Sequence, residues 1–148
     1  MAIAVVGVDL AKNIFHLHAV DQRGAVVFRC ARKRHDWVDS VRELVDPGAV
    51  VAMEACVSAH HWGRLLQSHG YEVRLIPGQF VKPFVKSNKS DRVDAEAIAE
   101  AAMGPGMRFV AVKSQRQQDL QALHRVRDDV IQQRPAEANQ PSAASLRR

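Results

Sequence analysis

Short apolar runs separated by turn residues fill the first part of the chain. Residues 3–8 are rich in Val and Ile, and residues 14–20 alternate between apolar and polar side chains. A glycine-containing turn at residues 21–24 leads into a third apolar run at residues 25–30. Two such runs joined by a short turn are typical of an antiparallel hairpin. The pattern therefore predicts three consecutive strands.

Helical spacing then alternates with two further apolar runs. Apolar residues recur at helical intervals over residues 37–45, and Asp46-Pro47-Gly48 ends this predicted helix. Residues 49–53 favour a strand buried on both faces. A helix follows, which we expect Ser58 to cap, and residues 71–76 favour another strand. The order β-β-β-α-β-α-β predicts an α/β fold, with a mixed sheet flanked by helices.

The second half of the chain favours helices. Residues 80–86 predict a helical turn or loop, residues 90–103 a helix, and residues 107–112 a strand or an extended connector. Residues 115–133 predict a long helix rich in Gln and Arg with a narrow apolar stripe. Such a stripe favours packing on one partner, such as a second copy of the chain, or on the chain's own core. The stripe consists of Leu120, Leu123, Val126 and Val130.

Periodicity and apolar content both fall after Pro135. We therefore expect a compact α/β domain over residues 1–112 and a long helix over residues 113–134 that begins an assembly region. Residues 135–148 are expected to form a disordered or frameshifted tail.

Composition narrows the class of protein. The 148 residues are 47% hydrophobic and 25% charged, as in ordinary globular domains. No apolar run is long enough to predict a membrane span. The two cysteines, Cys30 and Cys56, are too few for a disulfide framework and lack the spacing of a zinc site. A net charge of +5 favours a polyanionic partner.

Four carboxylates stand where chemistry is expected. Asp9 and Glu54 each follow a buried predicted strand, and the carboxyl ends of parallel strands are where open α/β sheets place their sites. Asp91 and Asp94 are three residues apart, on one face of a predicted helix. Each pair also has a structural interpretation, since an acid can simply end a strand or stabilise the first turn of a helix.

Taken together, these acids indicate a metal site. Four carboxylates brought close would repel one another without a cation, and two divalent ions about 4 Å apart would neutralise them. Mg²⁺ prefers such oxygen ligands, and Mn²⁺ takes similar ones. Lys and Arg side chains nearby would hold a nucleic-acid backbone. Phe80, Phe84 and Trp62 could stack on bases, although packing in a core explains them equally simply.

Several segments resemble the DEDD transposases of the insertion sequence 110 family. The resemblance covers about residues 3–134, and it is most specific from Val81 to Ala97. It is carried by Gly7-Val8-Asp9-Leu10-Ala11-Lys12, Met53-Glu54-Ala55-Cys56, the Val81 to Ala97 segment, Met107-Arg108-Phe109-Val110 and Val112-Lys113-Ser114.

This resemblance implies an RNase H-like, RuvC-like domain that carries out DNA recombination. It implies that Asp9, Glu54, Asp91 and Asp94 are the catalytic D, E, D and D that bind two Mg²⁺ ions, with Mn²⁺ as a substitute. The implied partners are the DNA of the element ends and target, a structured guide RNA and further copies of the chain, in a dimer or tetramer. A bacterial, cytoplasmic, nucleoid-associated protein without a membrane partner is expected. We expect the nucleic-acid contacts to come from Lys12, Lys82, Lys86, Lys89, Arg92 and Lys113.

Family members continue into a second domain with a serine thought to be the nucleophile, whereas this sequence stops at Arg148. The sequence is thus expected to be a truncated N-terminal catalytic domain, from a frameshift or from cloning. Two other functions stay open. The chain could be a stand-alone, structure-selective, Mg²⁺-dependent nuclease, or a non-catalytic remnant that binds nucleic acid.

Overall fold

The computed structural model describes residues 2–86 and 91–139, except for the side chains of residues 91–93 and 133–139. Contacts between residues divide the chain into two compact units, Met1–Val112 and Lys113–Arg148. The first unit holds all five strands and the helices that pack on them, and the second holds one long helix.

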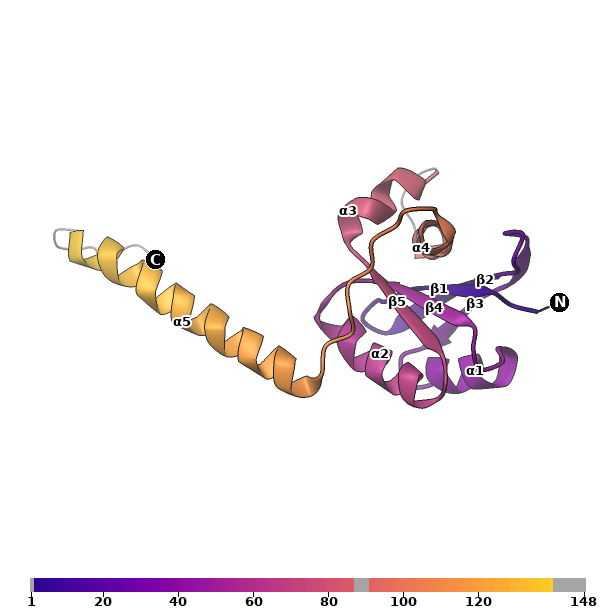
Figure 1. Cartoon of the computed structure of the whole chain (residues 1–148), viewed down its shortest axis with the longest axis horizontal. Helices are drawn as coiled ribbons and strands as arrows, with labels where there is room; N and C mark the ends of the chain where they lie inside the picture. The colour runs from indigo at the N-terminus through magenta and orange to yellow at the C-terminus, as the bar shows by residue number, and fades with distance from the viewer. Residues whose placement is uncertain (1, 87–90, 140–148) are drawn as a thin grey trace. The chain divides into compact units, whose positions relative to one another are not determined.

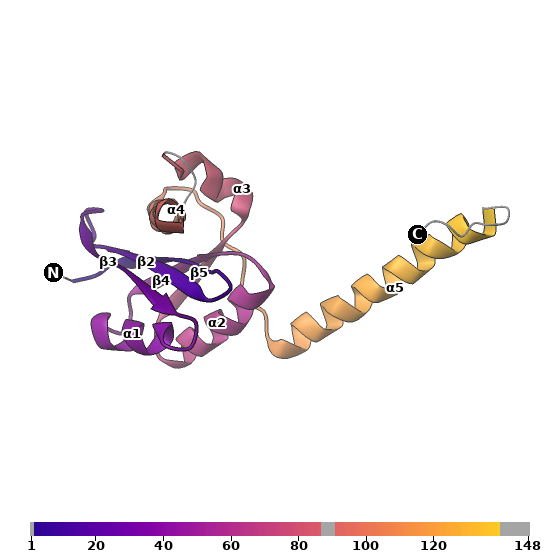
Figure 2. The same cartoon turned by 180° about the vertical axis from the view of Figure 1, so that it is seen from behind.

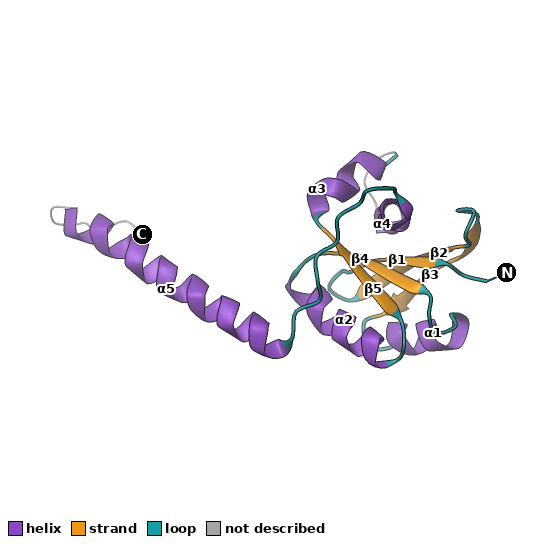
Figure 3. Ribbon diagram, viewed as in Figure 1, coloured by secondary structure: helices purple, strands orange, loops and turns teal. Residues whose placement is uncertain are grey.

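A five-stranded mixed sheet forms the centre of the first unit (Figure 3). The strand order is β3-β2-β1-β4-β5, with β2 antiparallel to β1 and β3, and with β1, β4 and β5 parallel. This confirms the predicted mixed sheet, and the arrangement is consistent with an RNase H-like fold. The strands are β1 (Val5–Asp9), β2 (Ile14–Val20), β3 (Val26–Lys33), β4 (Val50–Glu54) and β5 (Glu72–Ile76).

Helices cover both faces of this sheet. Helices α1 and α2 lie on one face, whereas α3 and α4 lie on the other (Figures 1 and 2). The short 3-10 helix η1 follows α3 directly, and α5 lies in the second unit. The helices are α1 (Trp37–Leu44), α2 (Val57–Ser68), α3 (Gly78–Val81), η1 (Lys82–Phe84), α4 (Asp91–Met103) and α5 (Gln115–Asn139).

Alternation along the central strands separates two hydrophobic cores. Val8 of β1 and Met53 of β4 belong to the core on the side of α1 and α2. Val5 of β1 and Ala52 of β4, which lie an odd number of residues away from Val8 and Met53, belong to the core on the side of α4. Because successive side chains of a strand point to opposite faces, this division also fixes the face of each remaining residue of β1 and β4. The central strands are buried on both faces, which explains their nearly continuous apolar sequence.

Gly7 allows α4 to lie directly on the middle of the sheet. A Cβ atom at this position would lie 2.6 Å from the backbone nitrogen of Ala99 and would also clash with the carbonyl oxygen of Ala95. The helix face that meets β1 is itself built from small residues, with Ala95, Ala99 and Ala102 buried. Glycine on the strand and alanine on the helix therefore set the height of α4 above the sheet.

Two details differ from the sequence-based expectations, and the structure decides between two alternatives for a third segment. Helix α2 begins at Val57 with Cys56 in the N-cap position and no capping side-chain bond, so the prediction of a Ser58 cap is wrong. The helix therefore starts two residues sooner than a Ser58 cap would require. Residues 107–112 form an extended connector that pairs with β5 through one bridge, Leu75 to Val110. Helix α5 continues to Asn139, past the boundary expected at Pro135, and residues 140–148 lie outside the described residues.

No helix within residues 2–86 and 91–139 combines the length and apolar character needed to cross a membrane.

Candidate active site

Asp9 and Glu54 come from neighbouring parallel strands at the same edge of the sheet. In the β1–β4 ladder Val8 lies opposite Met53, and the two acids are the next residue on each strand. Val8 and Met53 point into the core under α1 and α2, so the following side chains point to the opposite face, the side of α4. The sheet therefore places both carboxylates on one face and at one edge.

Helix α3 begins directly against Glu54. A Cβ atom at Gly78 would lie 3.2 Å from Cδ and Oε2 of Glu54, so the glycine leaves room for this exposed carboxylate. The backbone of Ala55 donates a hydrogen bond to the carbonyl of Ile76 at 2.8 Å, which ties the end of β4 to the end of β5. The position of Glu54 is thus set by the strand pairing and by the Pro77-Gly78 corner. From the sequence, Pro77-Gly78 predicts only the end of the strand at residues 71–76.

Asp94 lies on α4 beside the point where this helix meets the sheet. It is half-buried and directly precedes Ala95, whose carbonyl faces Gly7 two residues before Asp9. Asp91 is the first residue of α4, and its side chain lies outside the described part of the structure. The fold thus brings Asp9 and Glu54 to adjacent strand ends and lays the helix of Asp91 and Asp94 over the same face.

Three or more potential metal-ligating side chains do not meet in one group anywhere among the described residues. The donor chemistry nevertheless fits a hard divalent cation, since the acids on this face offer carboxylate oxygens, the ligands that Mg²⁺ prefers. Asp91 completes the expected set, and its carboxylate lies outside the described residues.

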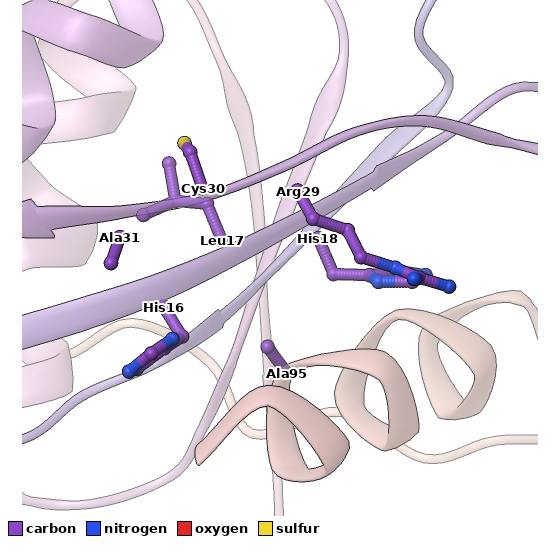
Figure 4. Close-up of a pocket in the computed structure, with 7 residues that line it drawn as sticks. All are labelled: His16, Leu17, His18, Arg29, Cys30, Ala31 and Ala95. Carbon is purple, nitrogen blue, oxygen red and sulfur yellow. The ribbon is translucent and has the colours of Figure 1, made fainter.

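His16 is the closest cross-strand neighbour of Asp9. The two residues lie directly opposite each other in the β1–β2 ladder, so their side chains share the face of α4. His16 also lines a cavity of about 200 Å³ together with His18, Arg29 and Ala95 (Figure 4). His16 and His18 lie on the same face of β2, as the alternation of apolar and polar side chains over residues 14–20 predicts. Their position beside Asp9 follows from the hairpin register, which the chain pattern alone does not supply.

His18 is buried beneath α4, and its surroundings disfavour the charged imidazolium. Burial lowers the pKa of His18 below its usual value, with a further lowering by Arg29 and Lys86 that Glu96 and Glu100 partly oppose. Figure 4 shows the Arg29 side chain lying alongside the His18 ring. A neutral ring is therefore the favoured form in the folded protein.

The basic residues expected to contact nucleic acid lie in different places. Lys12 is exposed in the loop that follows Asp9, and Lys82 is exposed at the start of η1. Lys86 forms a hydrogen-bonded ion pair with Glu100 of α4. The hydrogen bond to Glu100 raises the pKa of Lys86. Lys89 and the side chain of Arg92 lie outside the described residues.

Lys113 belongs to the second unit, where its Nζ donates a 2.7 Å hydrogen bond to Oε1 of Gln121.

The aromatic candidates are divided between packing and exposure. Trp62 packs on Phe15 and Trp37, Phe84 packs against the core under α4, and Phe80 is 37% exposed.

Comparison with known proteins identifies the family. A family model of the DEDD transposases of insertion sequence 110, described as "Transposase", matches residues 6–144. The chain is 50% identical over 140 residues to a probable family 20 transposase of Pseudomonas aeruginosa, covering 95% of this chain and 41% of that protein. It is 43% identical over 145 residues to the transposase for insertion sequence element IS1328 of Yersinia enterocolitica, covering 97% and 42%.

A third relative is the transposase for insertion sequence element IS1111A of Coxiella burnetii, 47% identical over 138 residues, with 93% of this chain and 37% of that protein covered. The chain thus spans about two-fifths of the length of the curated relatives that it matches. Since the family model covers nearly all of the chain, this protein belongs to the DEDD transposase family of insertion sequence 110.

Proposed function

We propose that this chain is the N-terminal catalytic domain of an RNA-guided DNA transposase or recombinase that cleaves and exchanges DNA strands with divalent metal. The observation that carries the proposal is the placement of Asp9 and Glu54 at adjacent parallel strand ends, on the face that α4 covers. Carboxylates at such an edge are suited to bind cations at a phosphate.

In this proposal Asp9, Glu54, Asp91 and Asp94 hold two Mg²⁺ ions, and Mn²⁺ can replace them. Metal bound there would activate the attacking group and stabilise the leaving oxygen of the scissile phosphate. The sheet holds Asp9 and Glu54 in a fixed relation, because Asp9 pairs with His16 of β2 and Glu54 pairs with Ile76 of β5. Helix α4 brings its own acids from above, at a height set by Gly7. The attacking hydroxyl itself would come from a serine in a further domain.

Nucleic acid would approach the same edge along exposed lysines. Lys12 lies three residues after Asp9 and two residues before the start of β2. Lys82 directly follows α3, and the first residue of α3, Gly78, adjoins Glu54. Both side chains are exposed and can contact phosphates. Lys86, Lys89, Arg92 and Lys113 extend the proposed contacts to the DNA of the element ends and target and to a structured guide RNA. We place this activity on chromosomal DNA in the bacterial cytoplasm.

Metal binding by the chain tests the proposal directly. We expect calorimetric titration with Mn²⁺ to show close to two equivalents bound, and Asp9→Asn to weaken that binding at least about tenfold, since it removes one anionic ligand. Asp39→Asn is the matched control, because Asp39 is exposed on α1, on the other face of the sheet.

Equal Mn²⁺ affinity in the wild-type chain and in Asp9→Asn would overturn the metal assignment. Binding of branched DNA without any cleavage, in the presence of Mn²⁺ and of a polypeptide carrying the family's second domain, would instead favour a non-catalytic remnant. Cleavage by this chain alone would favour a stand-alone nuclease.

A further inference from the structure

A second candidate site lies at the end of the β2–β3 ladder where Ile14 pairs with Lys33. This end of β2 follows Asp9 closely in the chain. A surface cavity of about 480 Å³ opens there between the end of β3 and helix α2. Its lining combines the ring of Trp62 with two cationic side chains, Lys33 and Arg34. The lining residues are Asn13, Ile14, Lys33, Arg34, His35 and Trp62.

Trp62 provides a rigid floor for this cavity. Its ring lies 5.3 Å from that of Trp37 and 5.8 Å from that of Phe15, both in edge-on geometry. The ring of His61 adds a third edge-on contact at 4.9 Å. Trp37 and Phe15 are fully buried, so the indole of Trp62 is fixed by the core while part of it remains accessible. Packing in a core and contribution to a surface site are therefore compatible here.

Arg34 lies over that ring. The carbon at the centre of its guanidinium is 5.6 Å from the Trp62 ring centroid, within the range of a cation–π contact. The backbone nitrogen of Arg34 donates a 2.8 Å hydrogen bond to the carbonyl of Asn13, which fixes the start of the side chain. The side chain is exposed, and within the described residues no carboxylate forms an ion pair with Arg34 or Lys33. A planar cation thus lies beside the indole ring on a side chain that is exposed to solvent.

This arrangement suits one nucleotide of a single strand. Nucleobases stack on Arg guanidinium planes and on aromatic rings, and the stack tolerates any sequence because every base has a π face. Lys33 beside the ring can contact a flanking phosphate, and the Asn13 amide can contact the edge of a base. His35 is engaged elsewhere, since its Nε2 lies 3.5 Å from Oδ2 of Asp36. The cavity lining contains no acid, which favours a polyanion over a cationic ligand.

We propose that the Trp62–Arg34 cavity is a stacking subsite for single-stranded nucleic acid, next to the carboxylate edge. Asn13 is four residues after Asp9, so their Cα atoms lie within about 14 Å of each other along the chain. A strand whose phosphate lies at Asp9 and Glu54 can therefore reach the cavity with its next few nucleotides. The inference rests on the proposed function only in taking a nucleic acid as the substrate.

Binding of short, labelled oligothymidylate and oligouridylate by the whole chain, measured by fluorescence anisotropy in a chelating buffer, tests this subsite. We expect Arg34→Ala to weaken binding at least about fivefold, the lower limit for loss of one stacked base. Arg34→Lys keeps the charge but loses the plane, and we expect it to weaken binding nearly as much. Arg23→Ala is the matched control, because Arg23 is equally exposed, in the turn at the other end of the β2–β3 hairpin.

Wild-type affinity in Arg34→Lys would overturn the stacking subsite, because charge alone would then explain the contact. Equal losses in Arg34→Ala and Arg23→Ala would overturn it as well. If Arg34 matters, the polymer that binds more tightly identifies the strand as DNA or RNA. Because the chelating buffer removes metal, this test is independent of the Mn²⁺ titration. Loss of the subsite with intact Mn²⁺ binding would overturn the subsite alone. An intact subsite without Mn²⁺ binding would overturn the metal assignment alone.

Discussion

At the scale of single residues, the absence of a side chain matters as much as any functional group. Gly7 does not have a left-handed backbone angle, so glycine is needed here because a Cβ atom would not fit beneath α4. The two nearest atoms that a Cβ at Gly7 would meet are backbone atoms of α4 and the third is the Cβ of Ala99, so none of them can rotate away as the end of a flexible side chain could. Any side chain at this position must therefore lift the helix that carries Asp91 and Asp94.

We predict that Gly7→Ala destabilises the first unit by about 3 kcal/mol or more, at the upper end of the range for overpacking. The measurement is urea denaturation followed by circular dichroism. Gly24→Ala serves as the comparison, because Gly24 has a φ of 85° and nothing within 4 Å of its Cβ position. That variant should lose only about 1–2 kcal/mol, the cost of a left-handed backbone. A Gly7→Ala protein no less stable than Gly24→Ala would contradict the close approach of α4.

At the scale of elements, the packing of α4 on β2 couples stability to pH. His18 lies under this helix, facing Arg29, Lys86, Glu96 and Glu100. Since its pKa is lower in the folded than in the unfolded protein, the unfolded chain binds more protons as the pH falls below 6.5. The contribution of neutral His18 to stability is therefore present above that pH and is lost below it.

We predict that the free energy of unfolding falls as the pH is lowered from about 7.5 to about 5.5, and that His18→Gln reduces this fall. Urea denaturation at several pH values measures both. His124→Gln is the control, because His124 is exposed on α5 in the other unit and should leave the pH dependence of the first unit unchanged. An unchanged pH dependence in His18→Gln would show that other groups are responsible.

Among the described residues of its own unit, no element covers the apolar stripe of helix α5. Leu123 is 65% and Val126 61% exposed, and Ile131 extends the same apolar character. A stripe as narrow as this matches the seam between two paired helices. We therefore expect α5 to assemble with a second copy of the chain.

The corresponding prediction is that the wild-type chain self-associates in sedimentation equilibrium and that Leu123→Glu shifts it towards monomer. Gln132→Glu adds the same charge at an exposed, polar position of the same helix and should leave the association constant unchanged. Monomeric wild-type chain at all accessible concentrations would refute pairing through α5.

At the scale of the whole molecule, the strands and helices were largely predictable and their relative positions were not. Residues 14–20 alternate so strongly that the predicted and observed limits of β2 coincide. The Ser58 cap was wrongly predicted because a capping residue is chosen by the path of the preceding loop as well as by its type. The candidate acids could be selected because each follows a strand or opens a helix. The grouping of Asp91 and Asp94 with Asp9 and Glu54 in one metal site stays a prediction.

The sequence by itself determined the element types, the acidic residues and the excess of positive charge, because these depend on periodicity, composition and local turn chemistry. Only the tertiary structure decided that Asp9 and Glu54 share the face of α4, since this depends on strand register and on which core Val8 and Met53 enter. It also brought Arg34 over Trp62, two residues from different elements that no spacing in the chain connects. Local interactions fix what each segment becomes, whereas burial of two separate cores fixes which segments meet.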